Sequence, residues 1–208
     1  MTDPVLLSRD GEVAVVTLNE PERRNALSLN MREVLFEILD EAMASDARAI
    51  VLTGAGGNFC SGGDIKSFDP GAPLVEIRDR LNRLHRVARI LLTGKKPVIA
   101  AVDGYAFGAG VSLALACDHV VAAKDSRFCA SFNRVALMGD LGLLYTLPLR
   151  VGMGKARELL MLGEIVEAAE ALTIGLVDRL VEPGRVLAAA IERAKLFAAS
   201  PPVALAMT

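Results

Sequence analysis

Two glycine-rich loops in the sequence can present free backbone N–H groups to a ligand. The stretch CSGGD covers Cys60–Asp64 and the stretch FGAG covers Phe107–Gly110. Each follows a short apolar segment that reads as a buried strand, ending near Thr53 and Val102 respectively. The carboxyl ends of parallel strands are the usual ligand crevice, and two N–H groups that converge on one oxygen form an oxyanion hole. The alternative for either loop alone is a tight turn packed against neighbouring backbone.

Other kinds of catalytic site receive little support from the sequence. Ser112 lies one turn beyond the second loop, but no G-x-S-x-G motif surrounds it, and neither His85 nor His119 is an evident partner. The stretch GAGVSL departs from the dinucleotide pattern GxGxxG, and no GKS or GKT follows it. We therefore interpret Ser112 as a small packing or lining residue. Asp118, at the end of the same apolar segment, is interpreted as a residue that ends a helix and fixes the next turn.

Composition excludes several function classes. The net charge of −2 gives no general attraction to nucleic acids or anionic membranes, and the absence of Trp argues against base stacking. Three cysteines without CxxC spacing argue against a disulfide framework or a zinc site, and are typical of a reducing cytoplasm. The first residues lack a signal-peptide pattern, and no apolar run approaches the ~18 residues of a membrane span. We expect a cytoplasmic protein with no metal, nucleic-acid or membrane partner.

The elements that position the two loops are an alternation of strands and helices. Val-rich or apolar segments predict strands at 12–18, 49–54, 97–104, 119–124 and, more weakly, 127–132. Apolar residues at helical spacing predict helices at 28–45, with Ser28 as N-cap, at 78–92 and at 185–199. After Asp140 the pattern is mostly helical, apart from a short strand within 176–182. Such alternation favours a parallel sheet with crossover helices, and the chain lacks linkers and repeats, so residues 1–208 are expected to form one domain.

Taken together, the two loops and their flanks resemble a known family. The stretches NFCSGGDIK and VIAAVDGYAFGAGVSLALACDHVVAAKDSRF, with RNALS and EAAEALTIGLVDRLVE, are similar to the enoyl-CoA hydratase/isomerase (crotonase) superfamily from about Val13 to the final helix. The resemblance implies an α/β fold of the ClpP/crotonase type, a spiral of ββα units. It also implies an acyl-CoA thioester substrate, no cofactor beyond the coenzyme A of that substrate, and homotrimers or hexamers. The C-terminal trimerisation helices usual in the family are largely missing from this sequence.

The resemblance assigns roles to individual residues. It gives the oxyanion hole to the backbone N–H groups of Gly63 and Ala109, although the family usually has Gly at the second position. Only the N–H of Ala109 is needed, so the role survives this departure. The residues that the resemblance places around the substrate are Ala26, Ser61, Asp64, Ile65, Lys66, Ser112 and Phe132. For Asp64, a helix cap is the favoured interpretation.

Acid–base chemistry in this family depends on carboxylates at three positions. Hydratases carry two glutamates at the positions of Ser112 and Phe132, and neither residue can act as an acid or base. Several isomerases instead carry an Asp or Glu at the position of Asp140, and this residue serves as the base. The alternative is that Asp140 caps a helix beginning at Leu141. An apolar wall of Phe132, Val135 and Leu137 is expected to raise the pKa of Asp140.

The resemblance therefore favours an enoyl-CoA isomerase with Asp140 as acid and base. Three other functions stay open. The chain could be a hydratase, either only in the name that a broad family label gives it or with weak hydratase activity. It could resemble 4-chlorobenzoyl-CoA dehalogenases, in which Asp140 would be the nucleophile, although that group has Trp at the position of Phe132. It could also be a catalytically silent acyl-CoA-binding protein.

Overall fold

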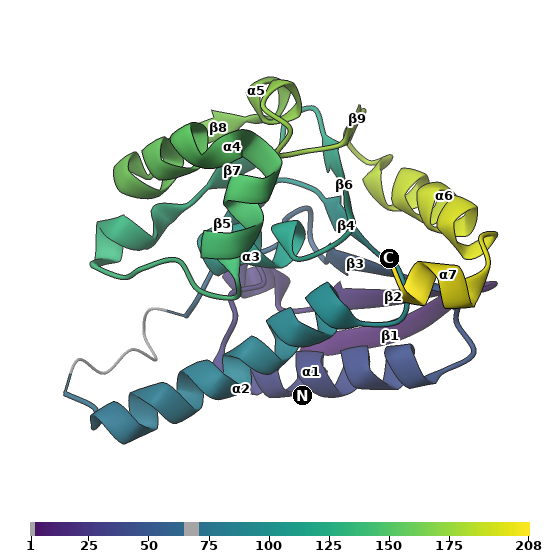
Figure 1. The fold of residues 1–208 in the computed structure, drawn as a ribbon, viewed down its shortest axis with the longest axis horizontal. Helices are drawn as coiled ribbons and strands as arrows, with labels where there is room; N and C mark the ends of the chain where they lie inside the picture. Colours follow the sequence, from purple (N-terminus) through teal and green to yellow (C-terminus); the bar gives the residue numbers. More distant parts are fainter. Residues whose placement is uncertain (1–2, 65–70) are drawn as a thin grey trace.

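A six-stranded sheet forms the centre of the molecule. The computed structural model describes residues 3–64 and 71–208, and the sheet has the order β1-β2-β3-β4-β6-β9 (Figure 1). Its strands are β1 (Val5–Asp10), β2 (Val13–Leu18), β3 (Ala49–Gly54), β4 (Val98–Val102), β6 (His119–Ala123) and β9 (Arg179–Val181). All neighbours pair in parallel except β1, which pairs antiparallel with β2. The predicted parallel sheet with crossover helices is confirmed.

A smaller sheet lies beside the ends of the central strands. Its strands β5 (Tyr105–Phe107), β7 (Arg127–Cys129) and β8 (Ile165–Glu167) pair in the order β5-β7-β8. Strand β5 follows β4 after a two-residue turn that contains Gly104 at a φ of 55°. Because β5 leads directly into the second glycine loop, the small sheet sets where that loop lies.

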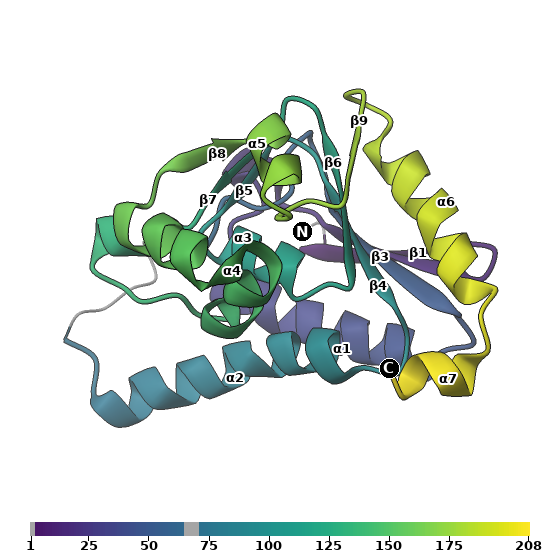
Figure 2. The same ribbon diagram turned by 45° about the horizontal axis from the view of Figure 1, so that its top comes forward.

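Helices cover both faces of the central sheet. Helices α1 (Leu29–Ala44) and α2 (Leu74–Thr93) lie side by side on one face, while α6 (Val186–Ala198) packs on the other (Figures 1 and 2). Side chains alternate along each strand, so that Leu52 faces the α1 side and Val51 packs against α6. Burial of both faces explains why the strands read as continuous apolar runs.

The remaining helices are η1 (Pro21–Arg23), α3 (Ala109–Leu115), η3 (Ser131–Val135), α4 (Leu143–Leu162), α5 (Ala168–Thr173) and α7 (Pro202–Ala206). Of these, α3, η3, α4 and α5 lie around the small sheet, η1 precedes α1, and α7 follows α6 on the other side of the molecule (Figures 1 and 2). Helix α4 is interrupted at Gly152, whose φ of 77° and ψ of 157° are not helical. In the described ranges, no helix combines the length and the apolar character that crossing a membrane requires.

Local signals in the sequence account for several element boundaries. The Ser28 side chain accepts a hydrogen bond from the Met31 N–H at 3.1 Å, so the predicted N-cap of α1 is confirmed. The Asp118 carboxylate accepts a hydrogen bond from the Val98 N–H at 2.7 Å, which fixes the turn after α3 as expected. Strands β1, β5 and β8 were not predicted. Strand β1 is an edge strand with mostly exposed side chains, and β5 and β8 are short strands that pair with β7 in the small sheet.

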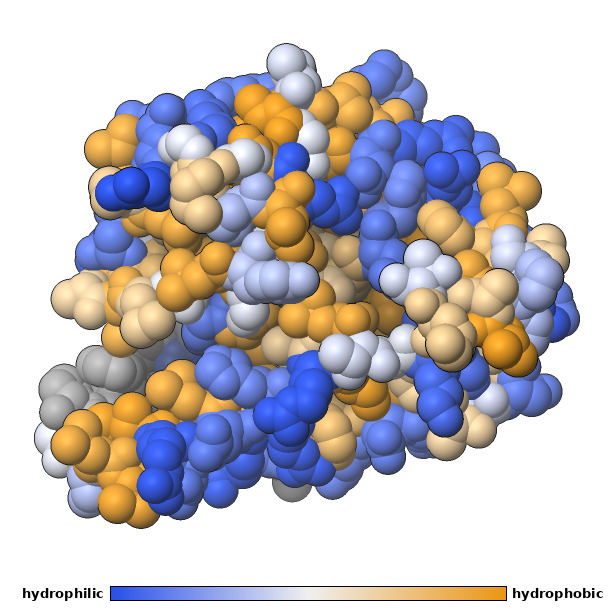
Figure 3. Space-filling view, viewed as in Figure 1, coloured by the Kyte–Doolittle hydropathy of each residue, from blue (hydrophilic) through white to orange (hydrophobic). Residues whose placement is uncertain are grey.

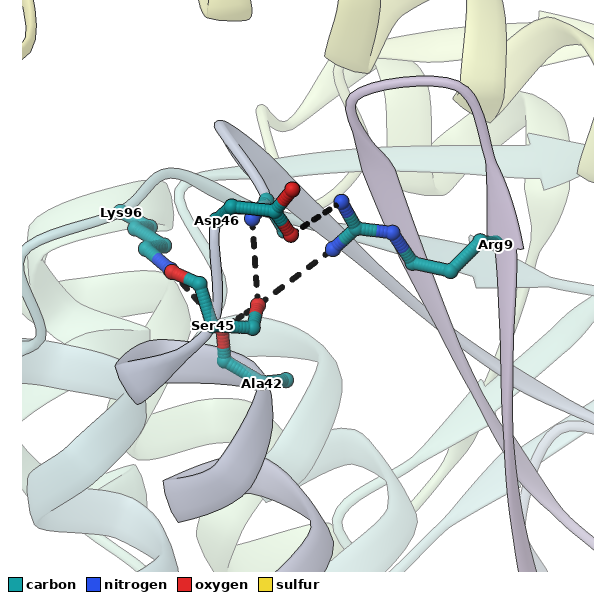
Figure 4. A network of polar contacts seen from close by, with 6 residues as sticks. Arg9, Ala42, Ser45, Asp46 and Lys96 are labelled. Atoms are coloured by element: carbon teal, nitrogen blue, oxygen red, sulfur yellow. Dashed lines mark hydrogen bonds and ion pairs between the residues drawn. The ribbon is translucent and has the colours of Figure 1, made fainter.

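The end of α1 is tied to the sheet by a network of polar contacts (Figure 4). Arg9 on β1 forms an ion pair with Asp46 at 2.7 Å. The Nζ of Lys96 donates hydrogen bonds to the carbonyl oxygens of Ala42 at 2.9 Å and Ser45 at 2.6 Å. These contacts tie the turn between α1 and β3 to β1, and the C-terminal end of α1 to the segment that enters β4.

Candidate active site

The two glycine loops pack against each other through their backbones. Cys60 and Ala106 form a parallel bridge, in which the Cys60 N–H donates to the Tyr105 carbonyl at 2.9 Å and the Phe107 N–H donates to the Cys60 carbonyl at 3.0 Å. The first loop is therefore an added strand-like edge of the small sheet. This pairing brings together two stretches that are more than forty residues apart in the sequence.

Glycine is required at this contact for steric reasons. A Cβ on Gly62, where φ is 105°, would lie 2.8 Å from the Phe107 carbonyl oxygen and 3.6 Å from the Ala109 nitrogen. A Cβ on Gly110 would lie 2.3 Å from the Cys60 carbonyl oxygen. Both distances to oxygen are shorter than side chains tolerate, so the glycines permit the close approach of the two loops.

Two backbone N–H groups at this junction have no hydrogen-bond acceptor among the described residues. Ala109 is the first residue of α3, a position whose N–H has no partner within the helix. Within the described ranges, neither the Gly63 N–H nor the Ala109 N–H donates a hydrogen bond to another residue. We predict that the two nitrogens lie within about 6 Å of each other, because each donor contact to a shared oxygen spans ~2.9 Å.

The segment before α1 lies along the first glycine loop. The Leu27 N–H donates to the Gly62 carbonyl at 2.8 Å, and the Ser61 N–H donates to the Arg24 carbonyl at 2.9 Å. Arg23 forms an ion pair with Asp64 at 2.6 Å. The structure thus brings Ala26, Ser61 and Asp64 to one region, and the Asp64 carboxylate engages Arg23. Ile65 and Lys66 lie outside the described residues.

Ser112 and Phe132 both lie in the interior. Ser112 is fully buried on α3, and its hydroxyl donates to the Gly108 carbonyl one turn earlier, at 3.4 Å. Phe132 is in η3 and is 7 % exposed. A serine hydroxyl directed to its own helix is what a packing residue does, which agrees with the interpretation of Ser112 from the sequence.

Asp140 precedes α4 but does not cap it. The interpretation that it caps a helix beginning at Leu141 is wrong. Leu141 and Gly142 have φ values of 50° and 82°, so the chain turns before the helix begins at Leu143. The N-cap position is Gly142, without a side-chain hydrogen bond. The Oδ1 atom of Asp140 is buried and has no hydrogen-bond partner among the described residues.

Burial changes the acidity of Asp140. It raises the pKa of this carboxyl to about 6, and the positive charge of Arg32 acts in the opposite direction. The expected increase is confirmed, but the expected wall is only partly present. Phe132 is buried, whereas Val135 and Leu137 are 40 % and 43 % exposed. A carboxyl group with a pKa near neutrality can both accept and return a proton.

Arg32 is a charged residue of this region that the sequence analysis missed. Its Nε donates to the Leu27 carbonyl at 2.9 Å, the same oxygen that the Asp64 N–H approaches at 3.4 Å. Its Nη2 lies 3.5 Å from the position that a Cβ on Gly63 would occupy. The signal in the sequence is its place in the first turn of α1, close to the segment that lies along the first glycine loop.

Comparison with known proteins places this arrangement in a family. A family model described as enoyl-CoA hydratase/isomerase matches residues 8–208. The chain belongs to the enoyl-CoA hydratase/isomerase family. Two curated relatives are a short-chain-enoyl-CoA hydratase of Clostridium acetobutylicum and a 1,2-epoxyphenylacetyl-CoA isomerase of Escherichia coli. The first is 35 % identical over 98 % of this chain and 78 % of its own length, and the second is 33 % identical over 100 % and 80 %.

Solved structures of the enoyl-CoA hydratase/isomerase family agree with the fold described above. A putative enoyl-CoA hydratase from Streptomyces coelicolor A3(2) superposes with a TM-score of 0.92 at 40 % identity, over 98 % of this chain and 76 % of that one. The crotonase-type α/β fold that the sequence predicted is therefore confirmed. This family member is an enzyme of a group that acts on CoA thioesters, and the names of its relatives include both hydratases and isomerases.

Proposed function

We propose that this family member is an enoyl-CoA isomerase, in which Asp140 alone moves a proton between two carbons of the acyl group. The observation that carries the proposal is the buried Oδ1 of Asp140, which has no hydrogen-bond partner among the described residues and belongs to a carboxyl with a pKa of about 6. A group that only stabilised the fold would be expected to have its hydrogen-bonding capacity satisfied. A carboxyl group with one buried, unpartnered oxygen and a pKa close to neutrality suits proton transfer.

The proposed reaction needs two features. The thioester oxygen accepts hydrogen bonds from the Gly63 and Ala109 N–H groups, which stabilise the negative charge of an enolate. For a 3-enoyl-CoA, Asp140 takes a proton from C2, and the electron pair of that C–H bond delocalises into the thioester and the adjacent double bond. The protonated Asp140 then returns its proton to C4, which leaves the double bond between C2 and C3. No water is consumed and no cofactor is required.

Hydration of the double bond is the second candidate, favoured by the hydratase names of several relatives. Hydration in this family uses two glutamates, whose positions the resemblance assigns to Ser112 and Phe132. The Ser112 hydroxyl is engaged with the Gly108 carbonyl, and the Phe132 ring offers no acid or base. Both observations support isomerisation over hydration.

Product analysis distinguishes the candidates. Purified protein is incubated with a panel of 2-enoyl-CoA and 3-enoyl-CoA thioesters of different chain lengths, and the products are separated by liquid chromatography with mass detection. The proposal expects isomers of unchanged mass. Products heavier by one water would favour the hydratase, and unchanged substrates that nevertheless bind would indicate a silent acyl-CoA-binding protein.

The pH dependence of turnover is a first prediction. The base form of Asp140 is its ionised form, and its pKa of about 6 lies above the ordinary value of an aspartate. We therefore expect kcat/KM to level off above pH 7 and to fall about tenfold per pH unit below pH 6, because protonation removes the base. Initial rates from pH 4.5 to 8 provide the measurement. A profile that stays flat down to pH 4.5 would contradict the role of Asp140 as the base.

Self-association is a second prediction. Large apolar side chains on α4 are exposed, and apolar surface is visible in patches over α4 and over the first turns of α2, at the lower left of Figure 3. Those on α4 are Leu144, Tyr145, Leu149, Met153, Met161 and Leu162. We propose that copies of the chain bury this surface as a homotrimer or a hexamer. Sedimentation velocity at micromolar concentration measures it, and a stable monomer would count against the proposal.

A further inference from the structure

Among the described residues, no direct contact neutralises the charge of Arg32. Its one hydrogen bond within the described ranges is from Nε to the Leu27 carbonyl, and no carboxylate there lies within ion-pair distance of it. The nearby Asp64 carboxylate is engaged by Arg23 at 2.6 Å. Burial lowers the pKa of Arg32, which reflects the cost of holding this charge away from water. Such a cation favours an anion as a ligand.

Asp140 has the largest charge effect on Arg32, ahead of Asp64, Arg80 and Cys60. Within the described ranges, no ion pair or hydrogen bond joins the Asp140 carboxylate to the Arg32 guanidinium. The buried Oδ1 of Asp140 also lacks a hydrogen-bond partner among the described residues. The two side chains therefore approach closely enough for their charges to interact while each keeps unused hydrogen-bonding capacity.

The location of Arg32 indicates which part of a substrate it would meet. Its Nη2 is 3.5 Å from the position of a Gly63 Cβ, and a Cβ is about 2.5 Å from its own nitrogen, so Nη2 lies at most about 6 Å from the Gly63 nitrogen. That nitrogen is the proposed donor to the thioester oxygen. The phosphates of coenzyme A are separated from the thioester by the long pantetheine arm, whereas a group on a short acyl chain stays close to it.

We propose that Arg32 binds a second carboxylate on the acyl group, so that the enzyme selects short acyl-CoA thioesters that carry a free carboxylate at the far end of the acyl chain. The planar guanidinium matches a carboxylate with two parallel hydrogen bonds, and its unused Nη groups provide them. The inference rests on the proposed placement of the thioester at Gly63 and Ala109, but it does not depend on the direction or the rate of the isomerisation.

The test compares two saturated thioesters with five-carbon acyl chains, glutaryl-CoA and pentanoyl-CoA, which differ in the terminal carboxylate. Their dissociation constants are measured by isothermal titration calorimetry at pH 7.5. Wild-type protein is expected to bind glutaryl-CoA ~10–100-fold more tightly, the range for one charge-assisted hydrogen-bonded contact. The variant Arg32→Gln is expected to lose this preference. The control Arg89→Gln removes the same charge from an exposed position on α2 and is expected to keep it.

Equal affinity of the wild type for the two thioesters would overturn the inference without any variant. A preference that persists in Arg32→Gln would overturn it as well, and so would an equal loss of affinity for both thioesters, since Arg32 would then act on the part they share. Neither ligand has a double bond, so these outcomes leave the isomerase proposal unaffected. Failure of the wild type to bind either thioester would instead overturn the acyl-CoA site itself, and the inference with it.

Discussion

Replacement of Asp140 by asparagine is expected to lower the rate of enoyl-CoA isomerisation by ~10²–10⁴, the range of general-base catalysis. The amide keeps the shape of the side chain and removes the proton acceptor whose Oδ1 is buried before α4. Binding of acyl-CoA should change little, because the proposed thioester donors are the backbone N–H groups of Gly63 and Ala109. Steady-state rates and calorimetric binding of a saturated acyl-CoA measure the two effects separately.

Ser112→Ala is the matched control for this experiment. The Ser112 hydroxyl is fully buried and donates to the Gly108 carbonyl, so its loss should leave the isomerisation rate within a fewfold of wild type. If Asp140→Asn were as active as wild type, another group would be the base. If Ser112→Ala were the variant that lost activity, the proton would pass through the serine, and the proposed mechanism would fail.

The change Gly110→Ala is expected to damage both stability and catalysis. The added Cβ would lie 2.3 Å from the Cys60 carbonyl oxygen, a backbone atom that also accepts the Phe107 N–H. Relief of this overlap must separate the two glycine loops. We expect a loss of ~1–3 kcal/mol in the free energy of unfolding, as for other overpacked sites, and a loss of up to ~10²–10³ in turnover if the Ala109 N–H moves. Chemical denaturation and initial rates measure these effects.

Gly154→Ala is the control for Gly110→Ala, because it makes the same glycine-to-alanine change at an uncrowded position. Gly154 is also helical, within α4, and a Cβ there meets nothing within 4 Å. Alanine is a better helix former than glycine, so this variant should be as stable as wild type or more stable, by up to ~1 kcal/mol. If Gly110→Ala behaved like Gly154→Ala, the close contact of the loops would not be required for folding or turnover.

The buried framework of the fold could be predicted from residue patterns. Continuous apolar runs such as Ala49–Gly54 marked strands covered on both faces, and Ser28 marked the start of α1. The edge strand β1 (Val5–Asp10) escaped prediction, because its exposed side chains lack the apolar pattern. The short strands β5 and β8 both pair with β7. Helix α3 and strand β6 separate β5 from β7 in the chain, and helix α4 separates β7 from β8, so local residue patterns do not reveal these pairings.

The candidate site was only partly predictable for the same physical reason. The two glycine loops could be recognised in the sequence, because close backbone contact requires glycine at positions such as Gly62 and Gly110. The environment of Asp140 depends on the positive φ values of Leu141 and Gly142, which place a turn between Asp140 and the start of α4 at Leu143. The role of Arg32 depends on the packing of α1 beside the first loop. Neither arrangement has a signature in residue spacing.

The central claim is that one carboxylate transfers a proton between two carbons without adding water. The most direct measurement is mass and NMR analysis of the products formed by wild-type protein from a 3-enoyl-CoA in deuterated water. The account predicts a 2-enoyl-CoA that carries deuterium at C2 or C4 wherever the proton on Asp140 has exchanged with solvent, and little 3-hydroxyacyl-CoA. Accumulation of 3-hydroxyacyl-CoA as the main product would contradict the account, because it would show that the enzyme adds water.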